Sequence, residues 1–89
     1  MQIWKFPIIT TDVQSVFMPV GAKILAVQLQ FGEPQIWALV VPSKRAEPRT
    51  IRVIGTGHPI VNDPGQYIGT YQLHEGQLVF HVFDGGIGV

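Results

Sequence analysis

Glycine and proline recur along the whole chain and set the strongest limit on its fold. The sequence has ten glycines and seven prolines, and neither type is confined to one region. Both residues disfavour a helix interior, glycine through its backbone freedom and proline through its missing N–H group. No window therefore remains for a long helix, and the intervals between these residues suit short strands.

Short runs of β-branched, aromatic and aliphatic residues follow one another along the chain. Their spacing of about ten residues is typical of a small sandwich or barrel. We predict strands at residues 2–9, 13–18, 23–31, 35–41, 50–54, 67–73 and 77–83. In the third run, alternation predicts one shared face for Leu25, Val27, Leu29 and Phe31. The predicted fold is all-β, a small antiparallel sandwich or barrel of about seven short strands in one domain.

Three segments also carry information about their place in the fold. Pro7 lacks a backbone donor, so residues 2–9 are predicted at a sheet edge or a bulge. Residues 35–41 are apolar on both faces, which is typical of a central or doubly covered strand. Residues 42–49 are polar and predict a loop, and residues 84–89 predict a flexible tail.

The last two runs are predicted to form a hairpin about residues 75–76. A two-residue turn there places Tyr71 beside Phe80 on an apolar face. The same register places Thr70 beside His81 on the opposite face.

The chain carries little charge for its 89 residues. Charged residues make up 13%, against ~25% in typical domains. Six basic and six acidic side chains balance, so non-specific nucleic-acid binding is not expected. A domain this small has a thin core and few charges here to cover its surface, so we expect a homo-oligomer. The lack of cysteine excludes disulfides, thiolate metal sites and a cysteine nucleophile.

The sequence gives no sign of a membrane or secretory protein. No run approaches the ~18–20 continuous apolar residues of a membrane helix. The first residues, MQIWKFP, lack the basic and then apolar pattern of a signal peptide. We therefore expect the protein to lie in the cytoplasm.

Positive charge is concentrated in residues 44–52. This segment holds Lys44, Arg45, Arg49 and Arg52 against a single acid, and no lysine or arginine follows it. Arginine binds phosphate through two parallel hydrogen bonds, so Arg45, Arg49 and Arg52 are candidate phosphate ligands. The ordinary alternative is a solvated loop that pairs weakly with the acidic half of the chain.

A glycine-rich tetrapeptide, Gly55-Thr56-Gly57-His58, follows the fifth run. Closely spaced glycines allow backbone N–H groups to converge on an anion, and His58 can add a donor. No Walker lysine, GxGxxG pattern or helix accompanies it, so the phosphate-loop and dinucleotide fingerprints do not apply. The alternative is a tight turn with glycine at positive φ.

The remaining candidate ligand residues follow from their predicted positions. Thr70 and His81 share a sheet face, where they can hold a base and a ribose, although a hydrogen-bonded structural role is the alternative for His81. Trp4 lies on a predicted edge strand and can stack on a nucleobase, although a core position is the alternative. The histidine spacing matches no metal motif, and no serine lies in a nucleophile-elbow pattern. The sequence therefore indicates no metal, cofactor or catalytic residue and does not favour an enzyme.

Six segments along the chain form a specific set. They are residues 3–6 (IWKF), 18–25 (MPVGAKIL), 36–40 (IWALV), 55–60 (GTGHPI), 67–70 (YIGT) and 79–83 (VFHVF). Together they resemble a family of short uncharacterised proteins encoded by phages and prophages. The resemblance implies a small phage protein acting inside a bacterial host cell as an accessory or counter-defence factor. It implies no catalytic residue, because no activity is established for that family.

Two classes of function fit these observations. The first is a non-enzymatic sponge that sequesters a nucleotide-type immune signal, such as a cyclic oligonucleotide or an ADP-ribose derivative, in a pocket between protomers. The second is a module that inhibits or adapts a host or phage protein through a strand edge or residues 84–89. Residues 44–58 discriminate between them, because only a polyanion pocket needs their cations and glycine turn. A phage structural part is a third reading, and an enzyme is the least favoured.

Overall fold

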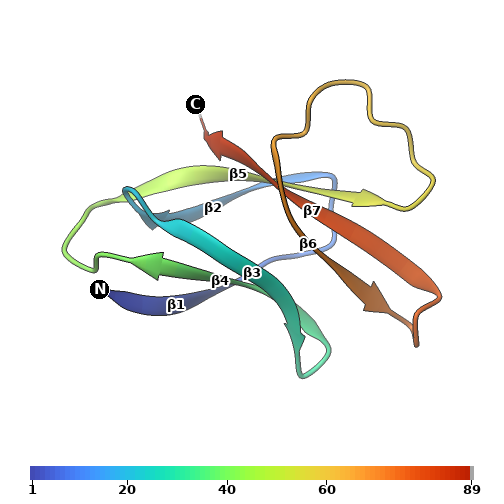
Figure 1. Cartoon of the computed structure of the whole chain (residues 1–89), viewed down its shortest axis with the longest axis horizontal. Coiled ribbons are helices and arrows are strands. Elements are labelled where there is room, and N and C mark those ends of the chain that lie inside the picture. The colour runs from blue at the N-terminus through green and yellow to red at the C-terminus, as the bar shows by residue number, and fades with distance from the viewer. Residues whose placement is uncertain (89) are drawn as a thin grey trace.

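The computed structural model describes residues 1–88, which form strands joined by turns and contain no helix (Figure 1). The strands are β1 (Gln2–Pro7), β2 (Val13–Pro19), β3 (Lys23–Gln30), β4 (Glu33–Val40), β5 (Ala46–Gly55), β6 (Gln66–Leu73) and β7 (Leu78–Ile87). Every pairing between them is antiparallel. The predicted all-β class is therefore confirmed.

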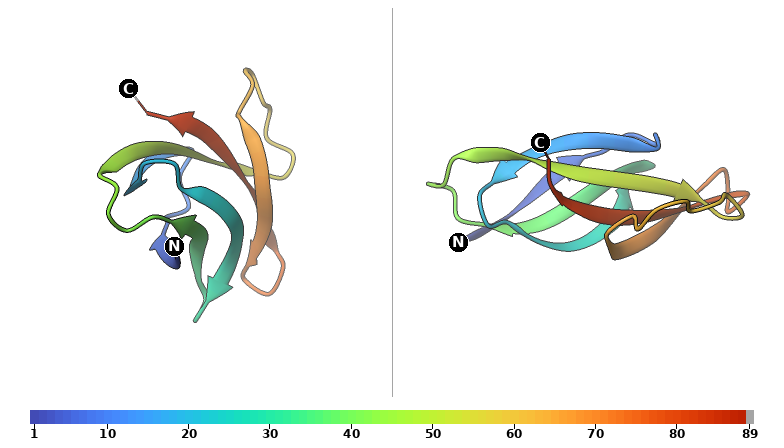
Figure 2. Two further views of the ribbon diagram at one scale, coloured as in Figure 1. Left: turned by 60° about the vertical axis from the view of Figure 1, so that its left-hand side comes forward. Right: turned by 90° about the horizontal axis from the view of Figure 1, so that it is seen from above.

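The strands form two layers. One sheet has the order β1-β4-β3 and the other has the order β2-β5-β7-β6. The two sheets face each other as a sandwich (Figure 2). They come together at β3 and β6, where a Cβ on Gly69 would lie only 2.9 Å from the Val27 side chain. These two strands are not hydrogen-bonded neighbours, so the sandwich does not close into a barrel.

The three-stranded sheet follows the sequence pattern closely. β4 is its central strand, as the apolar character of both faces predicts. β1 is an edge strand, as Pro7 predicts. Lys5 on β1 reaches across to Gln30 on β3 with a hydrogen bond of 2.5 Å. This bridge spans β4, where Trp37 pairs with Lys5 and remains only partly exposed.

Aliphatic side chains from both sheets fill the core between them. The largest fully buried side chains are Met18, Ile36, Val40, Ile51 and Val82. Tyr71 is buried beside them, and its hydroxyl forms a 2.7 Å hydrogen bond with Thr10. Burial raises the pKa of Tyr71, and the bond to Thr10 offsets part of this rise.

The β6–β7 hairpin has the predicted register. Tyr71 pairs with Phe80, and Thr70 pairs with His81. Residues 74–76 all have positive φ, so the turn reverses the chain tightly. The hairpin thereby brings Thr70 and His81 together on its outer face.

The C-terminal segment differs from the prediction. Residues 84–89 predict a flexible tail, but β7 continues to Ile87. The register pairs Ile87 with Arg49, and the N–H of Gly88 donates to the carbonyl of Pro48 at 2.8 Å. The tail finds this partner because β5 extends beyond its predicted start. The last residue of the predicted tail lies outside the described residues.

β5 begins earlier than predicted because its charge is paired inside the sandwich. The polar residues 42–49 predict a loop, but β5 starts at Ala46. Arg49 is buried, and it donates to the Asp84 carboxylate and to the Ala22 carbonyl, each at 2.8 Å. Pairing of residues 46–49 with β2, together with this ion pair, therefore extends the strand into a segment of loop-like composition.

β3 departs from the predicted alternation. The register between β3 and β4 shifts between Ile24 and Ala26, which is a β-bulge. Leu25 is 45% exposed as a result, whereas Val27 is buried. Phe31 lies beyond the strand at φ +52 and is 97% exposed. The prediction of one shared apolar face is therefore wrong for Leu25 and Phe31, whereas Val27 and Leu29 do share a face.

Removal of the Asp84 charge should destabilise the fold. Asp84→Asn leaves the buried Arg49 guanidinium without a counter-charge, and we expect the free energy of unfolding to fall by about 3 kcal/mol. Urea unfolding followed by tryptophan fluorescence measures this change. Asp12→Asn at an exposed position is the matched control and should change it by less than about 0.5 kcal/mol. Equal effects of the two variants would show that the ion pair does not support the fold.

Candidate ligand-binding site

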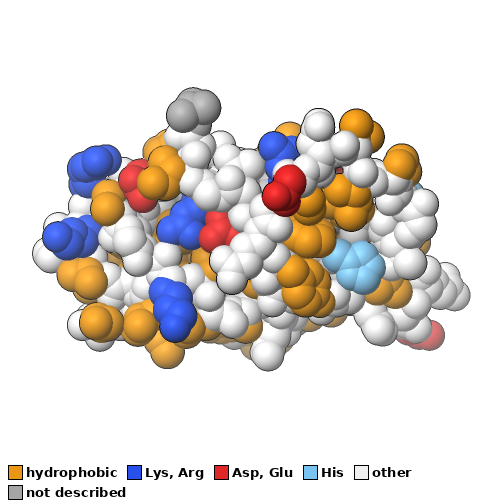
Figure 3. Space-filling view, turned by 45° about the horizontal axis from the view of Figure 1, so that its top comes forward, with side chains coloured by type: hydrophobic (Ala, Val, Ile, Leu, Met, Phe, Trp, Pro, Cys, Tyr) orange, Lys and Arg blue, Asp and Glu red, His pale blue; other side chains and the backbone are white. Residues whose placement is uncertain are grey.

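On the four-stranded sheet, the side chains that alternate with the core residues point to the outer face. Arg49 and Val53 of β5 point inward and are buried, so Arg52 and Ile54 project outward. Figure 3 looks onto this side of the molecule. Hydrophobic side chains gather there around a histidine, close to a basic and an acidic side chain. This face and the loop that follows β5 form the candidate site.

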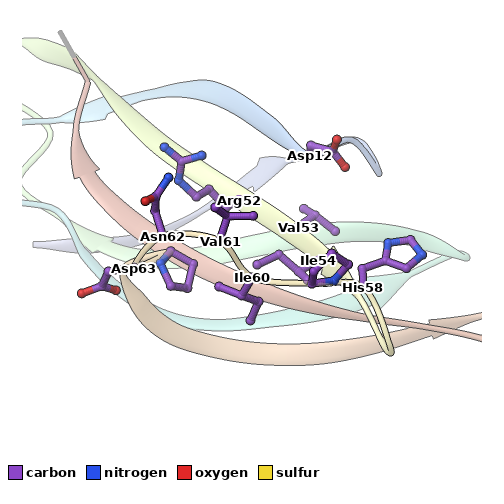
Figure 4. A pocket seen from close by; sticks show the side chains of 11 residues that line it. Asp12, Arg52, Val53, Ile54, His58, Ile60, Val61, Asn62 and Asp63 are labelled. Atoms are coloured by element: carbon purple, nitrogen blue, oxygen red, sulfur yellow. The ribbon is translucent and has the colours of Figure 1, made fainter.

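A cavity of about 420 Å³ lies between β5 and the loop of residues 56–65. Its side chains include Arg52 and Ile54 of β5 and His58, Ile60, Val61 and Asn62 of the loop (Figure 4). This volume lies within the range of ordinary small-molecule sites, roughly 300–1,000 Å³.

Polar groups lie at the two ends of the cavity. Arg52 and Asn62 project at one end, and His58 lies at the other (Figure 4). Ile54 and Ile60 lie between them. Such a lining suits a ligand with a planar or apolar middle and polar groups at its ends.

Arg52 is a cation without a partner in its own chain. Among residues 1–88, Arg49–Asp84 is the only ion pair, so Arg52 has no carboxylate bound to it. Asp63 lines the same cavity, but its carboxylate accepts a hydrogen bond from the N–H of Gly65 at 2.9 Å. An exposed and unpaired guanidinium is available to bind a phosphate or a carboxylate.

The glycine-rich turn holds the start of the loop. Gly57 has φ +88, as a tight turn predicts. The N–H of Thr56 donates to the Val79 carbonyl at 3.0 Å, and that of His58 donates to the Gly55 carbonyl at 3.1 Å. These two N–H groups are used within the fold and do not converge on an anion. A Cβ on Gly55 would lie 3.2 Å from the His58 ring, so glycine makes room for that ring.

His81 is the centre of a hydrogen-bond chain that ties this turn to the sheet. Its Nε2 lies 2.7 Å from Thr56 Oγ1, and its Nδ1 lies 3.0 Å from Thr70 Oγ1. Thr70 Oγ1 lies 2.5 Å from the Tyr67 hydroxyl. The Thr56 hydroxyl also lies 3.4 Å from the Val79 carbonyl, so two threonine hydroxyls, the His81 ring and the Tyr67 hydroxyl form one hydrogen-bonded chain. Both ring nitrogens are thus occupied in positioning the loop.

The other predicted ligand residues lie away from the cavity. Arg49 is buried in its ion pair. Arg45 precedes β5, at the end of that strand opposite the cavity loop. Trp4 lies on β1 in the other sheet and is 37% exposed. Of the three candidate arginines, the structure brings only Arg52 to the cavity.

Sequence reasoning missed the apolar wall and the amide of Asn62. Ile60 and Val61 lie in an irregular loop, where no periodicity indicates the direction of a side chain. The available signal was their composition. Two adjacent β-branched aliphatic residues inside a segment rich in proline, asparagine and aspartate are unusual in a freely solvated loop.

A family model described as a domain of unknown function, DUF7352, matches residues 1–87. The chain belongs to the DUF7352 family. No curated protein and no solved structure matches this DUF7352 chain. Membership is consistent with the resemblance to an uncharacterised family, and the family's description assigns no ligand or activity.

Within residues 1–88, no helix has the length and apolar character needed to cross a bilayer. In the same described residues, no three histidine, aspartate or glutamate side chains gather into a group able to hold a metal ion.

Loss of His81 should loosen the cavity loop. His81→Leu removes the bonds to Thr56 and Thr70, so we expect the free energy of unfolding to fall by about 1 kcal/mol and amide exchange to accelerate in residues 56–65. Hydrogen–deuterium exchange with peptide resolution measures the second effect. His74→Asn, in the β6–β7 turn, is the control and should leave exchange in the loop unchanged. Unchanged exchange in His81→Leu would contradict the positioning role.

Proposed function

We propose that this DUF7352 protein is a non-enzymatic binding protein that sequesters a small phosphate-bearing ligand of nucleotide type. The observation that carries the proposal is Arg52, an unpaired guanidinium at one end of a cavity with apolar walls. In the setting that the family resemblance implies, the protein is phage-encoded and acts in the host cytoplasm. Its ligand is then a nucleotide signal of bacterial immunity, which the protein withholds from its receptor.

In this proposal, each part of a nucleotide contacts a side chain of suitable chemistry in the cavity. The phosphate binds Arg52, because a planar guanidinium pairs with two phosphate oxygens at once. The base or ribose lies between Ile54 and Ile60, where burial of its faces is favourable. The amide of Asn62 both donates and accepts hydrogen bonds, so it can read a polar edge of the ligand.

The way in which the polar groups are used supports binding without reaction. The shortest hydroxyl–imidazole contact is between Thr56 and His81. Both side chains belong to the series of hydrogen bonds that anchors the loop, so neither is free for catalysis in this proposal. His58 lies at the far end of the cavity from Arg52 (Figure 4). The proposal therefore assigns these residues to holding the ligand and its loop, and it predicts that the ligand leaves chemically unchanged.

The Arg52 side chain should determine affinity. Arg52→Ala removes the charge-assisted bonds to phosphate, so we expect affinity to fall about ten- to hundredfold. Isothermal titration calorimetry with a panel of nucleoside monophosphates, cyclic dinucleotides and ADP-ribose derivatives measures this change. Mass spectrometry of ligand recovered after denaturation tests whether it is intact.

Arg45→Ala is the matched control for that experiment. Arg45 has the same charge but lies outside the cavity, so its loss should change affinity less than about twofold. Equal losses in the two variants would show that binding depends on net charge alone. Recovery of a modified ligand would overturn sequestration.

A protein-interaction module is the second candidate, and β2 is the observation that favours it. β2 is the edge of its sheet, has no charged residue and exposes Val13 and Phe17. Natural edge strands usually carry a charge that blocks further pairing. Added charge should therefore prevent a partner from extending the sheet.

Phe17→Lys tests this second candidate. Phe17 is 63% exposed, so the substitution should be tolerated while it abolishes binding of a partner protein through β2. Affinity purification from host lysate with quantitative mass spectrometry compares this variant with Arg52→Ala. A partner lost with Arg52→Ala but retained with Phe17→Lys would contradict pairing through β2.

A further inference from the structure

We propose that a second copy of this chain covers the cavity, through a two-fold interface on the outer face of the four-stranded sheet. The inference rests on the proposed function, because it names what completes that binding site. Three observations carry it, namely an uncovered apolar rim, unpaired charges of both signs and an open cavity.

The apolar rim consists of Ile60, Val61, Tyr67 and Phe83. Val61 is 86% exposed, Tyr67 is 56% exposed and Ile60 is 53% exposed. The strand register places Phe83 beside both Arg52 and Tyr67. The Tyr67 and Phe83 rings pack edge to face, with their centroids 5.7 Å apart. Ile60 and Val61 line the cavity and Phe83 lies beside Arg52, so the rim continues from the cavity loop onto the sheet.

The outer face of the other sheet is spanned by polar side chains, with Ile3 still 61% exposed beside them. Lys5 reaches across to Gln30, and Gln35 on the central strand is only 8% exposed. No such bridge from the described residues spans the apolar rim. A small domain with only 13% charged residues gains by burying a rim of this kind against another surface.

The charges beside the rim favour a second copy as the occupant. Arg52 is positively charged, Asp12 and Asp63 are negatively charged, and no ion pair forms among them within residues 1–88. A two-fold axis that passes between Arg52 and Asp12, which lie toward opposite ends of the cavity (Figure 4), brings the arginine of each copy against a carboxylate of the other. A surface of one sign would repel its own copy, whereas this mixed surface is self-complementary.

A second copy also completes the site. The cavity lies open on this face, whereas tightly held small ligands have roughly 70–90% of their surface buried. A covering copy supplies the missing wall and slows release of the ligand. It also brings a second Arg52 to the same face, and the five N–H donors of each guanidinium can bind a phosphate and also face a carboxylate of the other copy.

The experiment is native mass spectrometry of the ligand-free protein, wild type and variants, with size-exclusion chromatography and light scattering at several concentrations. Val61→Asp places a charge in the rim at a position too exposed to be needed for folding. Val61→Lys repeats the test with the opposite sign. Phe31→Asp is the matched control, because Phe31 is 97% exposed on the distant β3–β4 turn.

We expect a wild-type dimer, or a larger closed oligomer built on it, and the same state for Phe31→Asp. Both Val61 variants should be folded monomers by circular dichroism and should bind ligand at least tenfold more weakly. A monomeric wild type, or an oligomer that both Val61 variants leave intact, would overturn the inference. Monomeric Val61 variants with full affinity would overturn the claim that the second copy completes the site.

The same data separate this inference from the proposed function. The oligomeric state is measured without ligand, so it does not depend on which ligand the protein binds. An oligomer that both Val61 variants dissociate, but that binds none of the nucleotide panel, supports the interface and contradicts the proposed function. A monomeric wild type that binds ligand, with binding weakened at least tenfold by Arg52→Ala, supports the function and contradicts the interface.

Discussion

The largely buried ion pair between Arg49 and Asp84 joins three separate parts of the chain. Arg49 belongs to β5, Asp84 belongs to β7, and the carbonyl of Ala22 that Arg49 also binds lies in the turn before β3. A charge removed from water is tolerated only when it is paired and hydrogen-bonded, so these three segments must stay together. The pair thereby holds the end of β7 in the sandwich, where the sequence alone predicts a flexible tail.

The alternation of a strand then decides which basic residue remains for function. Arg49 and Arg52 are three residues apart on β5, so they project from opposite faces of the sheet. Because Arg49 takes the inward position, Arg52 must face outward, beside Phe83 and beneath the loop. On β5, the basic segment therefore supplies one structural cation and one exposed cation, rather than a cluster. The sequence did not reveal this division, because it depends on where β5 begins. A strand that starts before Arg49 sends Arg49 and Arg52 to opposite faces.

The sequence alone predicted those features that local patterns govern. The all-β class, the edge position of Pro7, the central β4 and the Thr70–His81 pairing follow from composition, alternation and turn chemistry. The start of β5 and the end of β7 depend on a contact between residues 35 positions apart, which no local pattern reveals. The bulge at Leu25 likewise depends on the partner strand. In the site, Arg52 and His58 were found by residue type, whereas Ile60 and Val61 became visible only when the loop had a fixed path.

The balance of charge around the cavity limits what the site can hold. Each chain contributes one unpaired arginine, while Asp12 and Asp63 line the same cavity. A ligand with several adjacent phosphates would face too little positive charge and would be repelled by the two carboxylates. One phosphate for each chain fits better, with the carboxylates accepting hydrogen bonds from the amino groups of a base. In a two-fold assembly this becomes two phosphates held by two Arg52 side chains, so a symmetric ligand with well-separated phosphates matches the site better than a polyphosphate.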